Sequence, residues 1–302
     1  MALPGRPGYV SMMANSPDRL PDGIRLGPVH LQVSDLARSL AYYEEVLGLH
    51  PLRRDGGSAV LGPEGEDTPL VVLRERPGTV PVARRARLGL YHFAILLPDR
   101  AALGRFVAHL ARIGARAGAS DHLVSEALYL TDPDGLGIEV YADRPKSEWT
   151  WRDGELVMST EPLDLERVMA AAGGEPWTGM PAGTRIGHLH LHVDALPEAA
   201  AFYQDALGFA PTVRSYPGAL FLSAGGYHHH LGLNTWAGPA AAVPTDTDAR
   251  LLEWTVVVPT PADAEAAARR MTAAGSEVKA EAGAWLLTDP WGTRLRLRAA
   301  PA

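Results

Sequence analysis

The segment GPVHLQVSDLARSLAYYEEVLGL at residues 27–49 returns as GHLHLHVDALPEAAAFYQDALGF at residues 187–209. The offset is constant, so that His30 aligns with His190 and Gly48 aligns with Gly208. Each copy reads as a short strand, a helix with apolar residues at helical spacing, and a glycine that ends the helix. Internal repetition of this kind is better evidence for architecture than any single propensity.

A second, weaker repeat alternates with the first. LYHFAILLP at 90–98 corresponds to LLEWTVVVP at 251–259, and TDPDG at 131–135 corresponds to TDPWG at 288–292. Helices are expected at about 100–112 and 261–274, each followed by strands. The sequence therefore predicts an α+β fold of four βαβββ modules, paired into two domains.

The expected boundaries follow from the repeats and from the composition between them. Residues 145–185 are rich in Pro, Gly and Trp, as expected of a linker. We expect a flexible N-terminal extension (1–24), an N-terminal domain of two modules with a metal site (25–145), a linker with a short helix at 163–172 (146–185), and a C-terminal domain of two modules with a degenerate site (186–302).

The composition limits the kinds of metal site and partner that this chain can have. The 302 residues contain no cysteine, 28 basic and 35 acidic side chains, and a formal charge of −7. Disulfides and thiolate metal sites are excluded, so a transition metal would be bound by His, Asp or Glu. The mild acidity argues against a nucleic-acid partner. No apolar run is suited to a signal peptide or a membrane span, and we expect a soluble cytoplasmic protein without a membrane partner.

Three residues form a candidate metal site. His30 and His92 each begin a strand-like segment, and Glu139 lies between apolar residues in a third. Two imidazoles and one carboxylate hold a ferrous ion on one face and leave its other positions open. An unpaired buried carboxylate is costly, which favours a ligand role for Glu139 over plain strand packing.

These residues and motifs resemble the vicinal oxygen chelate superfamily, which includes glyoxalase I, bleomycin-resistance proteins and type I extradiol dioxygenases. The segments at 90–98, 121–130, 137–145 and 225–236 are similar to the two-domain bacterial catechol-2,3-dioxygenase subgroup. The run from His122 to Glu139 also resembles the extradiol ring-cleavage signature, apart from Ser120, where the signature has another residue.

The resemblance implies an Fe(II)-dependent extradiol dioxygenase that opens a catechol-like ring with dioxygen; Mn(II) would accept the same ligands. It implies His30, His92 and Glu139 as metal ligands. His122 would then act as general acid or base, since imidazole titrates near neutral pH. Tyr129 would donate a hydrogen bond to a substrate oxygen. Superfamily members often dimerise, so a homodimer stays an open alternative.

The corresponding positions of the C-terminal half differ. Glu253 aligns with His92 and Arg296 aligns with Glu139. An arginine opposes a divalent cation by charge, which predicts one metal per chain, in the N-terminal domain.

Two other function classes remain open on the sequence. A glyoxalase-like isomerase or transferase would favour a second carboxylate ligand, where Val71 stands, and a bleomycin-resistance-type binding protein would need no metal. Two histidine clusters are expected to form a polar core or to line a substrate site: His188, His190 and His192, and His228, His229 and His230.

Overall fold

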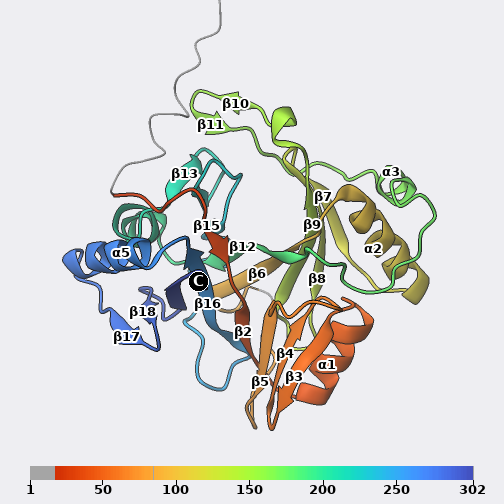
Figure 1. Cartoon of the computed structure of the whole chain (residues 1–302), viewed down its shortest axis with the longest axis horizontal. Coiled ribbons are helices and arrows are strands. Elements are labelled where there is room, and N and C mark those ends of the chain that lie inside the picture. The colour runs from red at the N-terminus through yellow and green to blue at the C-terminus, as the bar shows by residue number, and fades with distance from the viewer. Residues whose placement is uncertain (1–17, 84, 302) are drawn as a thin grey trace, which may run out of the picture.

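The four predicted modules are present in the computed structural model, which describes residues 18–83 and 85–301. Two large sheets form the centre of the molecule, and helices cover their outer sides (Figure 1). The α+β fold class predicted from the repeats is confirmed.

Each module contributes one helix region and four strands, with these bounds. Module 1 comprises β2 (Val29–Val33), α1 (Leu36–Glu45), β3 (His50–Asp55), β4 (Ser58–Gly62) and β5 (Val71–Glu75). Module 2 comprises β6 (Gly89–Leu96), α2 (Arg100–Ile113), β7 (Gly118–Asp121), β8 (Ser125–Thr131) and β9 (Gly137–Asp143). Module 3 comprises β12 (Arg185–His192), α4 (Leu196–Ala199) continuing into the π-helical η2 (Ala200–Ala206), β13 (Ala210–Val213), β14 (Ala219–Ser223) and β15 (Leu231–Asn234). Module 4 comprises β16 (Arg250–Val258), α5 (Pro261–Ala273), β17 (Lys279–Glu281), β18 (Ala284–Thr288) and β19 (Arg294–Ala299).

The remaining elements lie before and between the modules. The short strand β1 (Arg25–Leu26) pairs with β16. The linker contains η1 (Lys146–Glu148), β10 (Trp151–Arg152), β11 (Glu155–Leu156) and α3 (Leu165–Ala170). The short helix expected at 163–172 is therefore present.

The sheets do not follow the expected pairing of neighbouring modules. One sheet has the order β17-β18-β19-β16-β2-β5-β4-β3 and joins module 4 to module 1; the other has the order β13-β14-β15-β12-β6-β9-β8-β7 and joins module 3 to module 2. The first strands of two modules meet in each sheet, since β6 pairs with β12 and β2 pairs with β16. The boundaries at 25–145 and 186–302 thus separate sequence repeats, and each sheet draws on both halves of the chain.

Neighbouring modules touch through their helices instead. The Tyr43 hydroxyl on α1 donates to Asp132 in the turn after β8, and the Tyr203 hydroxyl on η2 donates to Asp289 in the matching turn after β18. Both carboxylates also accept two backbone N–H groups of their own turn. The aspartate of the repeated Thr-Asp-Pro-x-Gly motif therefore joins neighbouring modules through a hydrogen bond.

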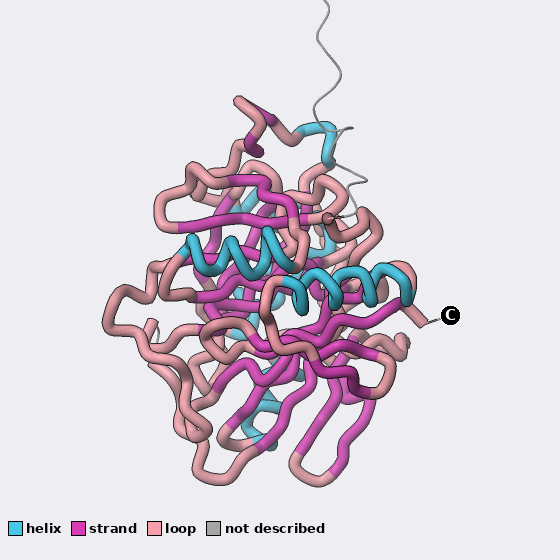
Figure 2. The backbone as a smooth tube through the Cα atoms, turned by 90° about the vertical axis from the view of Figure 1, so that its left-hand side faces the viewer, coloured by secondary structure: helices cyan, strands magenta, loops and turns pink. Residues whose placement is uncertain are grey.

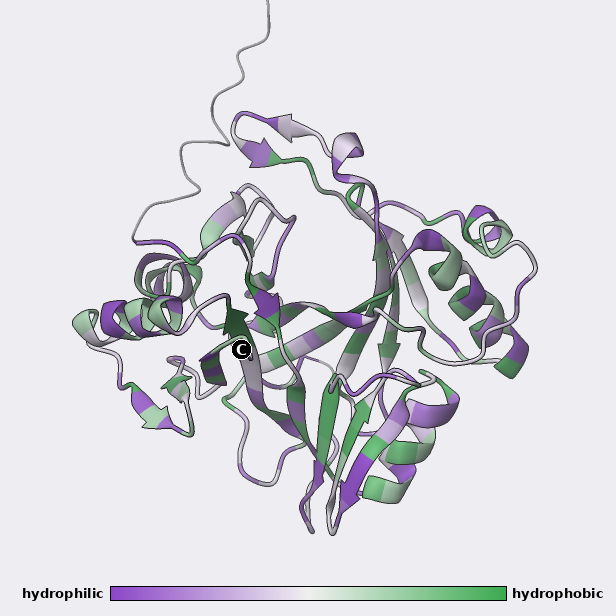
Figure 3. Ribbon diagram, in the orientation of Figure 1, coloured by the Kyte–Doolittle hydropathy of each residue, from purple (hydrophilic) through white to green (hydrophobic). Residues whose placement is uncertain are grey.

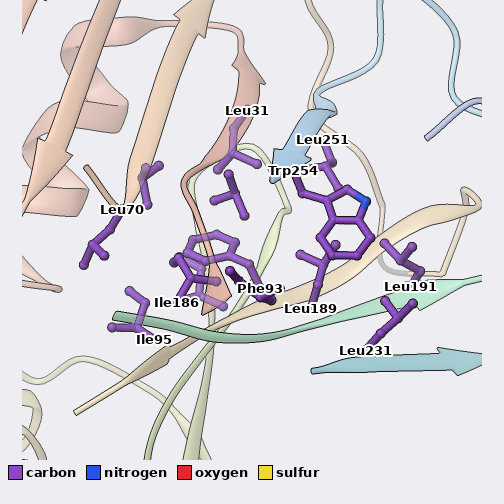
Figure 4. Packing of buried hydrophobic residues seen from close by; sticks show 14 of the residues in the cluster. Leu31, Leu70, Phe93, Ile95, Ile186, Leu189, Leu191, Leu231, Leu251 and Trp254 are labelled. Carbon is purple, nitrogen blue, oxygen red and sulfur yellow. The ribbon is translucent and has the colours of Figure 1, made fainter. Parts of the chain in front are cut away.

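The main hydrophobic core lies between the sheets, and two smaller buried clusters lie apart from it. Strand residues alternate faces, so Phe93 and Leu189 point into the core, where Leu31 and Trp254 of the other sheet meet them (Figure 4). The tube view shows the strands running through the middle of the molecule (Figure 2). Hydrophilic residues gather on the outer helices and loops (Figure 3).

Helix ends follow the expected capping chemistry. Asp35 caps α1 by accepting from the Arg38 N–H, and Gly48, expected to end this helix, has φ of 71°. None of the helices among the described residues is long and apolar enough to cross a membrane.

Part of the N-terminal extension expected at 1–24 is described by the structure and is packed against the rest of the chain. Residues 1–17 lie outside the described part of the chain. Residues 18–24 pack against module 3, where Leu20 is buried and its N–H donates to the Gly208 carbonyl.

Candidate metal centre

Four neighbouring strands, in the order β12-β6-β9-β8, carry a row of side chains across the cavity face of one sheet. In register, Ala94 of β6 lies between Glu139 of β9 and His188 of β12, and Tyr129 of β8 continues the row beyond Glu139. His92 stands two residues before Ala94 and so points to the same face. The small Ala94 side chain leaves space between the larger groups.

His92, Glu139 and His188 converge above Ala94. The Nε2 atoms of His92 and His188 lie 3.0 and 3.1 Å from Oε2 of Glu139, and one ligand atom from each residue falls within 4.8 Å of the others. All three residues are at most 5% exposed. No other group of three such residues in the described chain meets the same criterion.

The charges at this cluster favour a cation. Burial lowers the pKa of His92 and of His188, which keeps both imidazoles neutral with a free lone pair. Burial alone would raise the pKa of Glu139, but His188 and His92 outweigh that effect and hold the pKa well below its usual value. A carboxylate and two neutral imidazoles are the protonation states that bind metal.

The hydrogen bonding also fits a metal. The buried Nε2 of His92 lies near Glu139 without the alignment of a hydrogen bond, and it has no partner elsewhere. A buried polar atom without a partner costs free energy. Two imidazoles and one carboxylate on one side of a shared space suit a divalent first-row metal with open positions.

The structure brings together two of the three expected ligands and separates the third from them. It brings His92 and Glu139 together but places His30 in the other sheet, where its Cα pairs with Glu253 and Val72. The reason is the pairing of module 2 with module 3, which supplies His188 as the second imidazole. The site thus spans both halves of the chain.

A signal in the sequence could have identified His188. His92 stands seven residues before the helix N-cap Asp99, and His188 stands seven before the N-cap Ala195. His30 stands only five before Asp35. Counting from the helix start therefore aligns His188 with His92, whereas His30 corresponds to His190.

Arg296 and Glu253 occupy the matching positions in the other sheet. Arg296 Nε donates to Glu253 Oε1 at 2.6 Å, and Glu253 likewise stands seven residues before the N-cap Thr260. An ion pair thus fills the place that the three potential ligands fill in the first sheet.

His122 and Tyr129, the expected catalytic pair, are in contact. The Tyr129 hydroxyl lies 2.6 Å from Nε2 of His122, and Nδ1 of His122 lies 2.7 Å from the Ser159 carbonyl oxygen. A carbonyl can only accept, so Nδ1 carries a proton, and Nε2 can accept from Tyr129 when it carries none. The Tyr129 ring centroid lies 5.6 Å from that of His92.

The linker segment 157–161 supplies the carbonyl that orients His122. Backbone hydrogen bonds of 2.9 Å in both directions join Glu161 to Asp121, and the Thr160 hydroxyl lies 2.9 Å from the Tyr216 hydroxyl. Sequence reasoning missed this contact because any residue provides a backbone carbonyl.

The two histidine clusters divide between metal site, cavity wall and core. His190 opposes His92 in register, and its ring lies so close to Gly232 that a Cβ there would approach it to 2.8 Å. His192 Nδ1 lies 2.7 Å from Asn234 Oδ1. His229 lines the cavity, with its ring centroid 4.2 Å from that of His188.

His228 and His230 lie behind the cavity wall and are largely buried. His228 Nε2 lies 2.9 Å from Asp143 Oδ1, and Ser223 Oγ lies 3.1 Å from His230 Nδ1. Strand β15 begins at Leu231, directly after this cluster.

These side chains surround a cavity of about 510 Å³. Its walls come from both modules of the sheet, from the linker at Met158 to Thr160, and from the loop around Arg85 that connects module 1 to module 2. The cluster of His92, Glu139 and His188 therefore opens into a space large enough for an organic ligand.

Comparisons with known proteins show what this chain is similar to. The family model described as Glyoxalase/Bleomycin resistance protein/Dioxygenase superfamily matches residues 25–140 and 185–297. A curated protein of Bacillus subtilis (strain 168) named Catechol-2,3-dioxygenase is 46% identical over 269 residues, which cover 88% of this chain and 93% of that protein.

Solved structures share the fold at low sequence identity. One from Bacillus subtilis subsp. subtilis str. 168 matches with a TM-score of 0.61 at 13% identity, covering 92% of this chain and 86% of that one. Glyoxalase I from Zea mays matches with a TM-score of 0.53 at 19% identity, covering 91% and 92%.

Proposed function

This chain belongs to the glyoxalase/bleomycin resistance protein/dioxygenase superfamily, and we propose that it is a metal-dependent extradiol dioxygenase that opens catechol-like rings with dioxygen. The observation that carries the proposal is the buried cluster of His92, Glu139 and His188 at the base of the cavity. The 46% identity to a protein named Catechol-2,3-dioxygenase supports the same reaction.

We assign His92, Glu139 and His188 as the ligands of one divalent metal, Fe(II) by preference and Mn(II) as the alternative. A ferrous ion held by these three residues would supply open positions for the diol oxygens and for dioxygen and would allow electron transfer between them. Because the three side chains lie on adjacent strands of one sheet, the protein fixes their geometry before substrate arrives.

His122 is proposed as the group that takes a proton from the substrate. Its Nε2 atom faces Tyr129 inside the cavity, while the Ser159 carbonyl holds the proton on Nδ1. A diol hydroxyl that reaches Nε2 can transfer its proton to the imidazole, which can return it later in the reaction. The Tyr129 hydroxyl is then free to donate to a substrate oxygen on which negative charge develops.

The alternative functions fit the cavity less well. A glyoxalase-like isomerase would favour a second carboxylate ligand, and Glu139 is the single carboxylate among the described residues that line the cavity. Val71, at the position considered for that ligand, lies on β5 of the other sheet. A metal-free binding protein would leave the imidazole of His92 buried without a partner at Nε2.

Oxygen uptake tests the proposal. Protein purified without oxygen and loaded with Fe(II) should consume about one dioxygen per catechol and form a yellow ring-opened product. Glu139→Ala should abolish both signals. Binding of catechol without oxygen uptake, by protein shown to contain metal, would contradict the dioxygenase function and favour a binding protein.

A further inference from the structure

The cavity is larger than a single aromatic ring requires. Its volume is about 510 Å³, whereas an engineered protein cavity of roughly 150 Å³ holds one benzene molecule. A bare catechol at the metal cluster would therefore leave a large part of the space to other groups or to water.

One wall of this space is a continuous set of aromatic rings, here called the aromatic wall: Tyr91, Tyr216, Phe221 and Trp236. The Tyr91 and Trp236 centroids are 5.8 Å apart, those of Trp236 and Tyr216 6.1 Å, and those of Tyr216 and Phe221 5.7 Å. All four residues line the cavity. Such spacing leaves ring faces and edges available to another ring.

The aromatic wall adjoins the metal cluster. The Tyr91 ring centroid lies 4.8 Å from that of His92. His190, which opposes His92 across the strand pair, lies 5.4 Å from Trp236 and 5.6 Å from Phe221 by ring centroids. A diol bound at His92 would thus have the aromatic wall within reach of its ring substituents.

Polar groups of the aromatic wall are already engaged within the protein. Trp236 Nε1 donates to the Pro217 carbonyl at 3.0 Å, and the Tyr216 hydroxyl is paired with Thr160. These two rings therefore present mainly apolar surface to a ligand.

Charge is also scarce on the inner surface. Apart from histidines, the charged residues that line the cavity in the described chain are Glu139, Arg85 and Arg87. Glu139 is in the metal cluster, Arg87 is bound to Asp248, and Arg85 is exposed in the connecting loop. A charged substituent placed against the aromatic wall would lose water there, and the rings of the wall offer it no ion-pair partner.

We propose that the aromatic wall is a substrate subsite for a neutral, flat, apolar substituent about the size of a second aromatic ring. This inference rests on the proposed function, because it takes the diol to be bound at His92, Glu139 and His188. It narrows the substrate class from catechols in general to catechols that carry an aryl-like group.

Anaerobic calorimetry on metal-loaded protein tests the subsite without turnover. The probes are catechol, 3-phenylcatechol and a carboxylated catechol. We expect 3-phenylcatechol to bind about tenfold or more tightly than catechol, because a buried phenyl group leaves water. The carboxylated catechol should bind no better than catechol.

Substitutions distinguish the loss of the subsite from the loss of the folded structure. Trp236→Ala should cost about tenfold in affinity for 3-phenylcatechol and less than about threefold for catechol. Tyr91→Leu should have the same selective effect if the first variant does not fold. Trp285→Ala, a half-buried tryptophan on β18 of the other sheet, is the matched control and should leave both affinities unchanged.

Equal affinities of the wild type for catechol and 3-phenylcatechol, with catechol still cleaved, would overturn the subsite and leave the proposed function intact. Failure of the metal-loaded protein to bind or cleave either diol would instead overturn the proposed function, and the subsite with it.

Discussion

The Nε2 atom of His188 lies 3.1 Å from Oε2 of Glu139, although the two residues are 49 positions apart and belong to different halves of the chain. Pairing of β12 with β6 produces this contact, since it places His188 and Glu139 on either side of Ala94. The site therefore depends on the association of module 2 with module 3.

Space above Ala94 is the first requirement of that arrangement. Ala94→Leu should abolish metal binding, because the added carbons would fill the region between Glu139 and His188, and overpacking should destabilise the fold by about 1–3 kcal/mol. Elemental analysis and thermal unfolding measure the two effects. Ala94→Ser keeps a small side chain and should retain about one metal per chain; loss of metal in this variant as well would contradict the steric explanation.

His122 and Tyr129 should act as a unit. His122→Gln should lower kcat by about a hundredfold, the usual effect of losing a general acid or base. Tyr129→Phe should lower kcat by about tenfold or more, and metal content should remain at the wild-type level in both. Because the two side chains are 2.6 Å apart, the double variant should lose less than the product of the single effects. Strictly multiplicative losses would show that the two residues act independently.

The linker should affect catalysis through His122. Thr160→Val removes the hydroxyl that pairs with Tyr216 and should loosen the segment that holds the Ser159 carbonyl. We expect kcat to fall by about threefold to tenfold with KM little changed. Nitrogen NMR of labelled histidine should show His122 losing its fixed tautomer, and Thr160→Ser should restore it. Thr272→Val on α5, which removes a hydroxyl that bonds the Ala268 carbonyl, is the matched control. An unchanged His122 tautomer in Thr160→Val would count against this role of the linker.

Stability should depend on pH through Asp132. Burial raises the pKa of Asp132 from 3.8 to about 7, despite the hydrogen bonds that it accepts. The folded state thus prefers the protonated acid, and as pH rises from about 4 to about 7 the unfolded chain ionises first. The free energy of unfolding that Asp132 contributes is fully present below about pH 4, and it falls by about 3 kcal/mol as the pH rises to about 7.

Asp132→Asn cannot ionise, so its stability relative to wild type should increase over this pH range. Urea unfolding at pH 4.5 and 7.5 measures the difference. Asp289→Asn, in the equivalent turn of module 4, should also gain stability relative to wild type as the pH rises, since burial raises the pKa of Asp289 as well. Parallel pH profiles of wild type and Asp132→Asn would contradict the assignment.

Local features of the fold could be predicted from the sequence because local chemistry determines them. The helices expected at about 100–112 and 261–274 and the glycine after α1 all depend on residues within a few positions. The repeats likewise indicated four modules. Which modules share a sheet depends on long-range association, and the sequence alone did not encode that in any local pattern.

The dependence on long-range association also explains why His30, rather than His188, was expected beside His92 and Glu139. The resemblance implied one histidine from the first strand of each of two adjacent modules, and His30 occupies that place in module 1. His188 and His190 lie on the same face of β12, and the repeat aligns His190, not His188, with His30. Only the pairing of β12 with β6 brings His188 to Glu139. The equivalent positions Glu253 and Arg296 were recognised as unsuited to a cation, and in the structure they form an ion pair.

Metal content of two histidine variants tests the central claim most directly. His188→Ala and His30→Ala remove the same side chain from two first strands, and each protein would be purified without oxygen and analysed for iron and manganese. We predict a metal-free His188→Ala protein and about one metal per chain in His30→Ala. A His30→Ala protein without metal beside a fully loaded His188→Ala protein would contradict the site described by His92, Glu139 and His188.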